Sequence, residues 1–372
     1  MTATPHSPGR AGPARSSGVR EPGRLRAMVR LGRVKFLLQS SSVVGAGTAV
    51  AVAASGGFSP RMYLLVLLFA WLGHLMTHYC NEFFDLDADR ANPSPTSWTG
   101  GSRVLVDGLL PPRVSLSAAF VLLFCALCTA MALPTAGQRL VAVAVLAVSW
   151  FYTAPPVRLN YRALGEVACA TVLYALVPLL AFLAQSTPVT PELFAYLGVV
   201  FALQLLRCLI MNLPDIPGDQ RVGKTTLAGV LGPSNVTRAY AGGNALVYAA
   251  VAVVTVTGTL PPVTGGALLA TLPIPVWVAS RLRTGVLGDQ RGAELVTFWS
   301  SMLLPATSCA VIVGMTVTAF LGRGAPGPWL VVATATIALF GAWLARTVPA
   351  TVGRSRRATR RDRRSATGVG AT

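Results

Sequence analysis

Residues 61–90 read RMYLLVLLFAWLGHLMTHYCNEFFDLDADR, an apolar run that ends abruptly in a cluster of acids. As a helix, about twenty apolar residues are enough to cross the hydrocarbon core of a bilayer. Similar runs recur along the chain, of whose 372 residues 53% are hydrophobic and only 12% are charged. A soluble domain usually carries about 25% charged residues. The sequence therefore predicts an all-α fold, a polytopic membrane helix bundle.

Ten apolar stretches have the length of a membrane span. We expect helices near residues 36–55, 61–82, 114–133, 139–154, 164–185, 192–212, 240–257, 262–280, 295–321 and 328–346. Residues 36–321 would form one transmembrane domain, with 328–346 as a possible extra membrane helix. The flanks, residues 1–35 and 347–372, are rich in Pro, Gly, Ser and Arg, a composition typical of disordered basic tails.

The net charge of +18 comes mainly from the two ends of the chain. Residues 1–35 and 346–372 hold sixteen of the 31 Lys and Arg residues but only two acids, Glu21 and Asp362. We expect these tails to contact anionic membrane lipids rather than nucleic acid.

The basic residues between the spans give the orientation, because cytoplasmic loops carry an excess of Lys and Arg. With the N-terminus in the cytoplasm, the inner loops hold eleven of them: Arg90, Arg103, Arg113, Arg158, Arg162, Arg221, Lys224, Arg238, Arg281, Arg283 and Arg291. The outer loops hold three: Arg61, Arg139 and Arg323. We therefore expect a multi-pass protein of the plasma membrane, with both tails and the acidic loops in the cytoplasm.

Six of the thirteen Asp and Glu residues lie in two short segments at span ends. The first segment runs from Asn81 to Arg90 and contains the pattern N-x-x-x-D-x-x-x-D. A spacing of four places Asn81, Asp85 and Asp89 on one face of a helix. Such a ladder of oxygen atoms suits Mg²⁺, which binds one or two carboxylates together with water and phosphate oxygens.

The second segment, residues 212–219, reads NLPDIPGD and contains another D-x-x-x-D, formed by Asp215 and Asp219. Because Pro214 and Pro217 flank Asp215, we expect the span to end there and the acids to lie on a tight turn. Carboxylates near a membrane are unfavourable unless they are paired or functional. Two such sets can hold metal ions on both sides of a diphosphate.

Four ordered motifs together resemble the UbiA superfamily of intramembrane prenyltransferases. Besides the acidic segments, residues 99–110 (TGGSRVLVDGLL) look like a loop of the menaquinone-type, dihydroxynaphthoate polyprenyltransferase-like branch. Residues 152–166 look like the family's loop between helices 4 and 5, and residues 220–232 follow the second motif as in that family. The resemblance runs from about residue 30 to 320. It implies nine membrane helices around a central cavity, one fewer than the ten predicted spans.

The resemblance also implies an enzyme, a transferase that moves a prenyl group from a prenyl diphosphate to an aromatic acceptor, such as the quinone precursor dihydroxynaphthoate. An allylic diphosphate ionises readily once the charge of the departing diphosphate is neutralised, so Mg²⁺ is the expected cofactor. We assign Asn81, Asp85 and Asp89 to one Mg²⁺, and Asp215 and Asp219 to a second.

Further candidates lie close to these motifs. Lys224, five residues after Asp219, is the only lysine besides Lys35 and is expected to neutralise phosphate oxygens during catalysis. We expect substrate contacts from Asn212, Arg103, Tyr152, Arg158 and Arg207. Arg207 lies inside a span, where an arginine needs a partner or a wet cavity. For the loop cations the alternative is ordinary positive-inside topology.

Two rival functions remain open at this point. A membrane terpene cyclase of the same superfamily would carry both acidic motifs and use no acceptor. A transporter would instead place its charges near the bilayer midplane, whereas these acids concentrate at span ends. His74 and His78, one helical turn apart, indicate either a metal site that lacks a third ligand, a proton acceptor, or polar packing.

Overall fold

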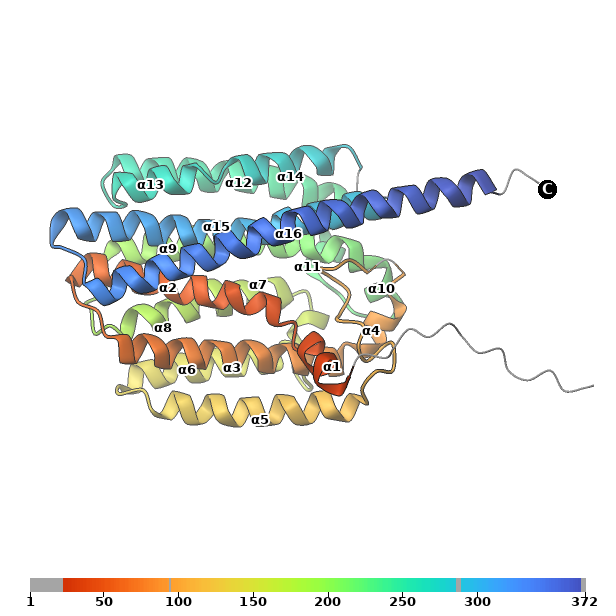
Figure 1. The fold of residues 1–372 in the computed structure, drawn as a ribbon, viewed down its shortest axis with the longest axis horizontal. Coiled ribbons are helices and arrows are strands. Elements are labelled where there is room, and N and C mark those ends of the chain that lie inside the picture. The colour runs from red at the N-terminus through yellow and green to blue at the C-terminus, as the bar shows by residue number, and fades with distance from the viewer. Residues whose placement is uncertain (1–22, 94, 286–288, 369–372) are drawn as a thin grey trace, which may run out of the picture.

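The computed structural model describes residues 23–93, 95–285 and 289–368, with side chains to Gly353. Figure 1 shows long helices lying side by side along one axis. They are α2 (Leu37–Ser55), α3 (Pro60–Phe84), α5 (Pro112–Met131), α6 (Ala136–Phe151), α7 (Gly165–Thr171), η3 (Val172–Leu176), α8 (Val177–Leu183), α9 (Pro191–Asn212), α12 (Pro233–Val256), α13 (Pro262–Leu269), α14 (Pro273–Arg283), α15 (Gln290–Gly322) and α16 (Gly327–Gly368).

Within the described chain, nine helices are long and apolar enough to cross a membrane. They coincide with nine of the ten predicted spans. The remaining stretch forms α6, which has 16 residues, spans about 24 Å, and lies alongside α3 and α5. The possible extra helix at the C-terminus is present as α16, which packs against α15 and α2.

Prolines shape two of the spans. Between α7 and α8 the chain forms η3, a π-helical turn that precedes Pro178. A proline inside a helix has no N–H to donate and clashes with the preceding turn, and a wider turn accommodates it. The span predicted over 262–280 is also broken before a proline, but by a tight turn of i to i−3 hydrogen bonds between α13 and α14, ahead of Pro273.

Small residues let the central helices approach closely, as is common between membrane helices. A Cβ atom added to Gly47 of α2 would lie 2.3 Å from the Pro178 carbonyl oxygen of α8. One added to Gly314 of α15 would lie 2.4 Å from the Cα of Thr264 in α13. Larger residues at these glycines would force the helices apart and loosen the bundle around its cavity.

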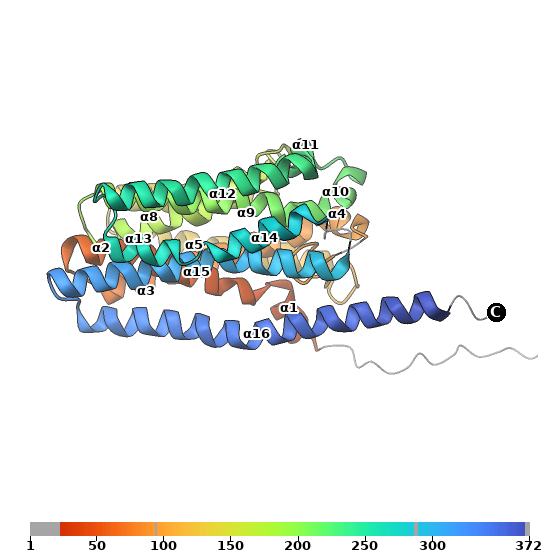
Figure 2. The same cartoon turned by 90° about the horizontal axis from the view of Figure 1, so that it is seen from above.

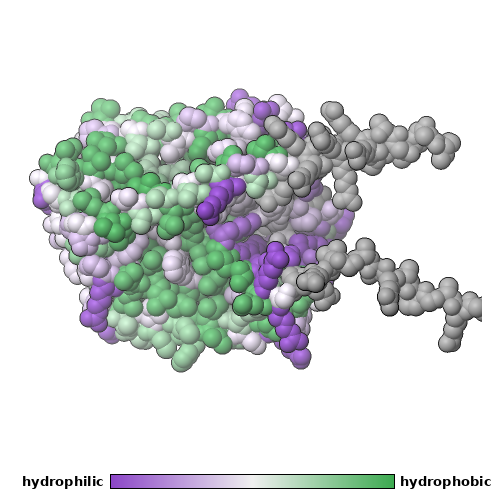
Figure 3. All heavy atoms as spheres, in the orientation of Figure 1, coloured by the Kyte–Doolittle hydropathy of each residue, from purple (hydrophilic) through white to green (hydrophobic). Residues whose placement is uncertain are grey.

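The outer surface is largely apolar, as Figure 3 shows by the green that covers most of the bundle's side. Its exposed side chains include Phe124, Leu140, Leu246 and Val256. Purple, hydrophilic residues gather instead at the ends and around a hollow near the end from which α16 projects. This pattern fits a bundle surrounded by lipid with its polar opening at one end.

Two predictions about the tails need correction. Residues 24–31 form α1 (Arg24–Leu31), whose Ala27 and Leu31 are buried, and α16 continues as helix to Gly368. The prediction of disorder rested on amino-acid composition. Composition does not show that α1 has an apolar face, which packs against Tyr79 and Cys80 of α3. The rest of the predicted disorder, residues 1–22 and 369–372, lies outside the described residues.

Short helices and loops gather at one end of the bundle in both Figure 1 and Figure 2. We call this end the cap. It consists of α1, α4 (Leu86–Ala91), η2 (Leu159–Tyr161), η4 (Leu213–Asp215), α10 (Ile216–Arg221), α11 (Leu227–Leu231) and the loops at residues 92–111, 152–164 and 222–226. Both acidic segments lie in the cap.

Candidate active site

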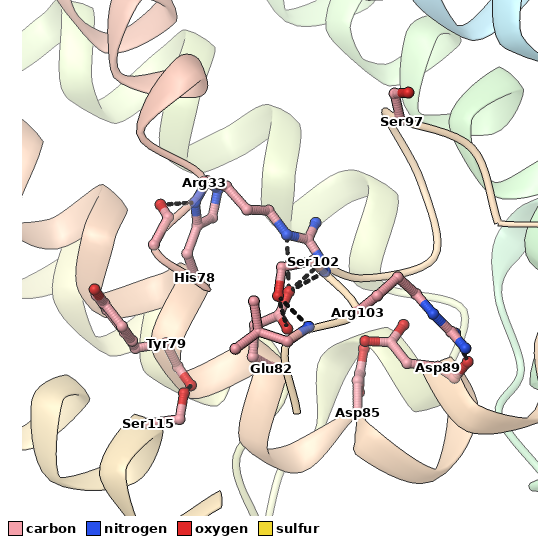
Figure 4. Close-up of polar contacts among 12 residues, drawn as sticks. Arg33, His78, Tyr79, Glu82, Asp85, Asp89, Ser97, Ser102, Arg103 and Ser115 are labelled. Carbon is pink, nitrogen blue, oxygen red and sulfur yellow. Dashed lines mark hydrogen bonds and ion pairs between the residues drawn. The ribbon is translucent and has the colours of Figure 1, made fainter. Parts of the chain in front are cut away.

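The first acidic segment keeps the helical register that its spacing predicts. Helix α3 ends at Phe84, but the Asp85 N–H still donates to the Asn81 carbonyl at 2.8 Å, and the Asp89 N–H to the Asp85 carbonyl at 2.9 Å. Asn81, Asp85 and Asp89 therefore follow one another by single turns, and all three line the same cavity. Figure 4 shows Asp85 and Asp89 beside each other at this bend.

The second acidic segment differs from its prediction. The chain does not leave the helix for a tight turn, because α9 continues through the 3-10 turn η4 into α10. Pro214 and Pro217 occupy the first turns of η4 and α10, where a missing N–H costs no hydrogen bond. Asp215 and Asp219 thus lie one helical turn apart, as the acids of the first segment do.

The two segments meet across the cap. Asn92, just after α4, donates from its side chain to Asp215 Oδ1 at 2.7 Å. A Cβ on Gly218 would lie 2.8 Å from the Cα of Asn92, so only glycine allows α10 to approach this closely. The Arg221 guanidinium adds a hydrogen bond to the Ala91 carbonyl at 3.2 Å.

Lys224 lies between the two acidic segments. Its Nζ is 3.1 Å from Asp85 Oδ2 and 3.3 Å from Asp219 Oδ1, and its side chain is 13% exposed. Burial lowers the pKa of Lys224, but the facing carboxylates outweigh this effect and hold the pKa well above its ordinary value. The ammonium group is therefore a permanent positive charge at the junction of the motifs.

The carboxyl group of Asp89 has a raised pKa. Burial, reinforced by the nearby acids Glu82 and Asp85, raises its pKa to about 8, although Arg33 and Lys224 oppose the shift. Without a further cation, this carboxyl is mostly protonated near neutral pH. A bound cation would displace that proton.

The site's residues fit a hard divalent cation. Asn81 Oδ1 and Asp219 Oδ2 are buried oxygens with no hydrogen-bond partner. One carboxylate of each segment, Asp85 and Asp219, faces Lys224. No group of three or more His, Cys, Asp or Glu side chains in the described chain forms a complete metal site. Sparse protein ligation of this kind is usual for Mg²⁺ bound together with phosphate groups.

Arg33 and Glu82 fix the segment that faces Asp89. The Arg33 guanidinium donates twice to Glu82 Oε1, at 2.6 and 2.8 Å, and Ser102 donates to both carboxylate oxygens at 2.6 Å (Figure 4). This network ties the N-terminal segment and residues 99–110 to the end of α3. It brings Gly101 so close that a Cβ there would lie 2.1 Å from Asp89 Oδ2.

The cavity has a volume of about 240 Å³ and runs from the cap into the bundle. At the cap end it is lined by Asp85, Asp89 and Asp215, with Asn212 and Lys224. Further in, its walls are mostly apolar and include Val145, Val148, Val172, Leu173 and Val177. Tyr152, His74, His78 and Arg207 also line it. The arrangement gives one end rich in acids and an inner chamber lined by both apolar and polar side chains.

Two predicted substrate contacts lie elsewhere. Arg103 reaches the Asp89 carbonyl oxygen and lines a separate opening of about 620 Å³ at the surface, not the cavity itself. Arg158 stacks on the ring of Tyr161, with 3.5 Å from its guanidinium carbon to the ring centre. Both residues brace the cap in this structure.

The two cavity histidines are held by hydrogen bonds. His74 Nδ1 lies 2.5 Å from the Ser40 hydroxyl, and His78 Nδ1 lies 2.9 Å from the Gly32 carbonyl. Their rings meet edge to face with centres 4.5 Å apart. This arrangement gives them polar packing partners and no third metal ligand among the described residues.

Sequence reasoning missed three buried residues that hold the site together. Asn160 donates to both oxygens of Asp85, at 3.0 and 3.2 Å. Glu166 accepts from the Asn212 side chain at 2.8 Å and from the Ala228 N–H at 3.0 Å. The third residue is Glu82. The two glutamates could have been noticed in the sequence, because only thirteen acids occur in the chain and both glutamates lie in or beside the motifs discussed above.

Comparison with known proteins agrees with this architecture. Residues 42–302 match the family model of the UbiA prenyltransferase family. A search of curated proteins finds no match.

Solved structures of helical membrane proteins share the fold at low sequence identity. A UbiA homolog from Aeropyrum pernix K1 matches with a TM-score of 0.59 and 19% identity, covering 77% of this chain and 98% of that one. A UbiA homolog from Archaeoglobus fulgidus bound to GPP and Mg²⁺ matches with a TM-score of 0.57 and 18% identity, covering 77% and 99%. A digeranylgeranylglyceryl phosphate synthase matches with a TM-score of 0.53 and 17% identity, covering 78% and 98%.

Proposed function

Because the chain belongs to the UbiA prenyltransferase family, we propose that it transfers the prenyl group of an isoprenoid diphosphate to an aromatic, quinone-precursor-like acceptor. One observation carries this proposal. Two acidic motifs from distant parts of the chain meet around Lys224 at the charged end of a cavity that has apolar side chains such as Val145, Val172 and Leu173 further in. This end suits a diphosphate with its metal ions, and the apolar side chains suit an isoprenoid chain.

Mg²⁺ is the proposed cofactor, held by Asn81, Asp85 and Asp89 on one side and by Asp215 and Asp219 on the other. When bound, it neutralises diphosphate oxygens and makes diphosphate a better leaving group. The orphaned oxygens of Asn81 and Asp219 support this assignment, because a buried acceptor without a donor is unfavourable. The Archaeoglobus fulgidus homolog bound to GPP and Mg²⁺ supports the choice of ion.

Lys224 is proposed to contact the departing diphosphate directly. Its ammonium group lies between the motifs, where oxygens of a bound diphosphate would come closest to both. Fixed positive charge placed where negative charge develops lowers the barrier to ionisation without costing reorganisation. The same two carboxylates that now pair with Lys224 hold it in position beforehand.

The apolar walls of the cavity are proposed to protect the allylic cation. Valines 145, 148, 172 and 177 offer no nucleophile, and their side chains leave little room for water beside the prenyl chain. An electron-rich aromatic carbon then attacks the cation. Aromaticity returns when the ring loses a proton, or loses a carboxylate as CO₂.

We further propose that the cap faces the cytoplasm of the plasma membrane. The excess of Lys and Arg in the loops at this end supports that orientation. Water-soluble diphosphate would then leave on the side where it is recycled.

The test uses the full-length protein in detergent or in vesicles with Mg²⁺ and geranyl, farnesyl or geranylgeranyl diphosphate. Diphosphate release and organic products are measured with and without 1,4-dihydroxy-2-naphthoate. The expected product is a prenylated aromatic compound whose formation depends on the acceptor. A cyclic hydrocarbon or alcohol formed without acceptor would instead identify a terpene cyclase, and transport without diphosphate release would identify a transporter.

A further inference from the structure

Arg207 is a buried cation inside a membrane-spanning helix. It lies on α9, eight residues before Asp215, a separation of about 12 Å along a helix axis. The residue is 8% exposed and lines the cavity together with Cys208 and Met211. It therefore lies deeper in the bundle than the acids of the cap.

The guanidinium of Arg207 has no acidic counter-ion among the residues that the structure describes. Its Nη2 donates to the Ser301 hydroxyl at 3.3 Å, whereas its buried Nε has no hydrogen-bond partner. The ion pairs found among the described residues involve Arg33, Arg90 and Lys224, and none includes Arg207. A charged group buried within a membrane span is unfavourable unless it is paired or serves a function.

The other cations that line the cavity are already paired with acids. Arg33 pairs with Glu82, and Lys224 pairs with Asp85 and Asp219. Among the cavity's acids, Glu166 accepts two hydrogen bonds at Oε1, whereas its buried Oε2 has no partner among the described residues. The cavity thus has an excess of acids at the cap and an excess positive charge at Arg207.

We propose that Arg207 is the counter-ion for a carboxylate on the aromatic acceptor, and so determines acceptor specificity. This inference rests on the proposed transferase function. A planar guanidinium can form two parallel hydrogen bonds to a carboxylate, a geometry that fixes direction as well as position. The unpartnered Nε is one donor of such a pair.

The opposite charges of the two ends would also orient the acceptor. At the cap, Lys224 and the metal ions held by the acids would be taken up by the diphosphate, so this end offers no free cation to a second anion. The acceptor's carboxylate is therefore held at Arg207, and the ring lies between Arg207 and the allylic carbon. The attacked ring carbon is then one that bears hydrogen, and loss of its proton restores aromaticity. A neutral analogue of the same shape lacks this anchor.

The experiment measures binding separately from turnover. The purified full-length protein is saturated with Mg²⁺ and geranyl S-thiolodiphosphate, which ionises too slowly to react. Binding of 1-hydroxy-2-naphthoate and of its neutral amide is then measured by calorimetry. Arg207→Gln removes the charge. Arg207→Lys keeps the charge but cannot form two parallel hydrogen bonds to a carboxylate. Arg61→Gln, which removes an exposed arginine, is the matched control.

The wild type is expected to bind the acid more tightly than the amide. Arg207→Gln should weaken binding of the acid roughly 10- to 100-fold and leave binding of the amide unchanged, with Arg207→Lys between them. Affinity for the thiolodiphosphate, measured first, should be unchanged and shows that each variant is folded. Arg61→Gln should behave as the wild type.

Equal binding of the acid by wild type and Arg207→Gln, or no binding of the acid at all, would overturn the role of Arg207. The proposed function fails in a different manner, when diphosphate is released but no aromatic compound is prenylated. Charge-dependent binding at Arg207 without prenylation would support the anion site and reject the transfer reaction.

Discussion

The two acidic motifs are held in place by each other's neighbours. Asn92, which follows the first motif, donates to Asp215 of the second at 2.7 Å. Lys224, which follows the second motif, lies 3.1 Å from Asp85 of the first. The first motif has an additional donor in Asn160, which reaches both oxygens of Asp85.

This cross-bracing means that neither motif is positioned on its own. Each acidic segment continues a membrane helix, so the carboxylates are carried by rigid elements, but their directions depend on contacts across the cap. Groups that act as a unit show strongly non-additive effects when they are removed singly and together. We therefore expect a substitution in either motif to lower the rate of diphosphate release about as much as substitutions in both.

The largest effect is expected from removing one acid of either motif. Asp85→Ala and Asp215→Ala should each lower the rate of diphosphate release about 10³-fold, because each removes charge that stabilises the leaving group through its metal ion. The double variant should be less than about tenfold slower than either single variant. Single-turnover release of labelled diphosphate measures all three rates.

Asp87→Ala is the matched control, since Asp87 lies between the two acids of the first motif but its side chain is 83% exposed. It should retain the wild-type rate. Substantial turnover by both Asp85→Ala and Asp215→Ala would show that the motifs do not hold the metal ions.

A smaller loss, about 10²-fold, is expected for Lys224→Met. The variant removes the charge between the motifs but leaves their carboxylates free to bind metal. Affinity for Mg²⁺ should rise or stay unchanged, because the competing ammonium is gone, while the ionisation rate falls. Arg238→Met, which removes an exposed cation of α12, should leave both quantities unchanged. A fall in Mg²⁺ affinity with an unchanged rate would place Lys224 in a purely structural role.

The membrane bundle and the first motif were predictable because their signals are local. An apolar run of about twenty residues specifies a span, and a spacing of four specifies one helix face. The helical register from Asn81 through Asp85 to Asp89 confirms the second of these. The tight turn predicted at the second motif was wrong, because Pro214 and Pro217 do not end the helix but occupy first-turn positions of new helices.

The supporting residues could not be predicted because their partners are far away in the sequence. Arg33 and Glu82 are 49 residues apart, and Asn160 and Asp85 are 75 apart. Nothing in the local pattern around Arg33 distinguishes it from the other arginines of a basic tail. Arg207 was the exception, since the cost of burying its charge marked it within a span.

Removing the braces should have a milder effect that differs between the motifs. Asn160→Ala frees Asp85, and Asn92→Ala frees Asp215, so each should raise the Mg²⁺ concentration needed for half-maximal release about tenfold. In the double variant the two effects should be less than multiplicative, because the braced motifs share one bound diphosphate. Independent, fully multiplicative effects would show that the motifs bind their ions separately.

The smallest effect is a pH dependence of metal binding at Asp89. Burial raises the pKa of this carboxyl to about 8, so protons compete with the metal ion below that pH. Apparent metal affinity should therefore fall about fivefold between pH 8 and pH 7, as the deprotonated fraction falls. Lys224 does not contribute, because its pKa lies well above this range.

Binding of Mn²⁺, followed by electron paramagnetic resonance, measures the effect without turnover. Asp89→Asn should bind weakly and lose most of this fivefold change, whereas Asp87→Asn should follow the wild type, and a full fivefold change retained in Asp89→Asn would assign the titration to another group.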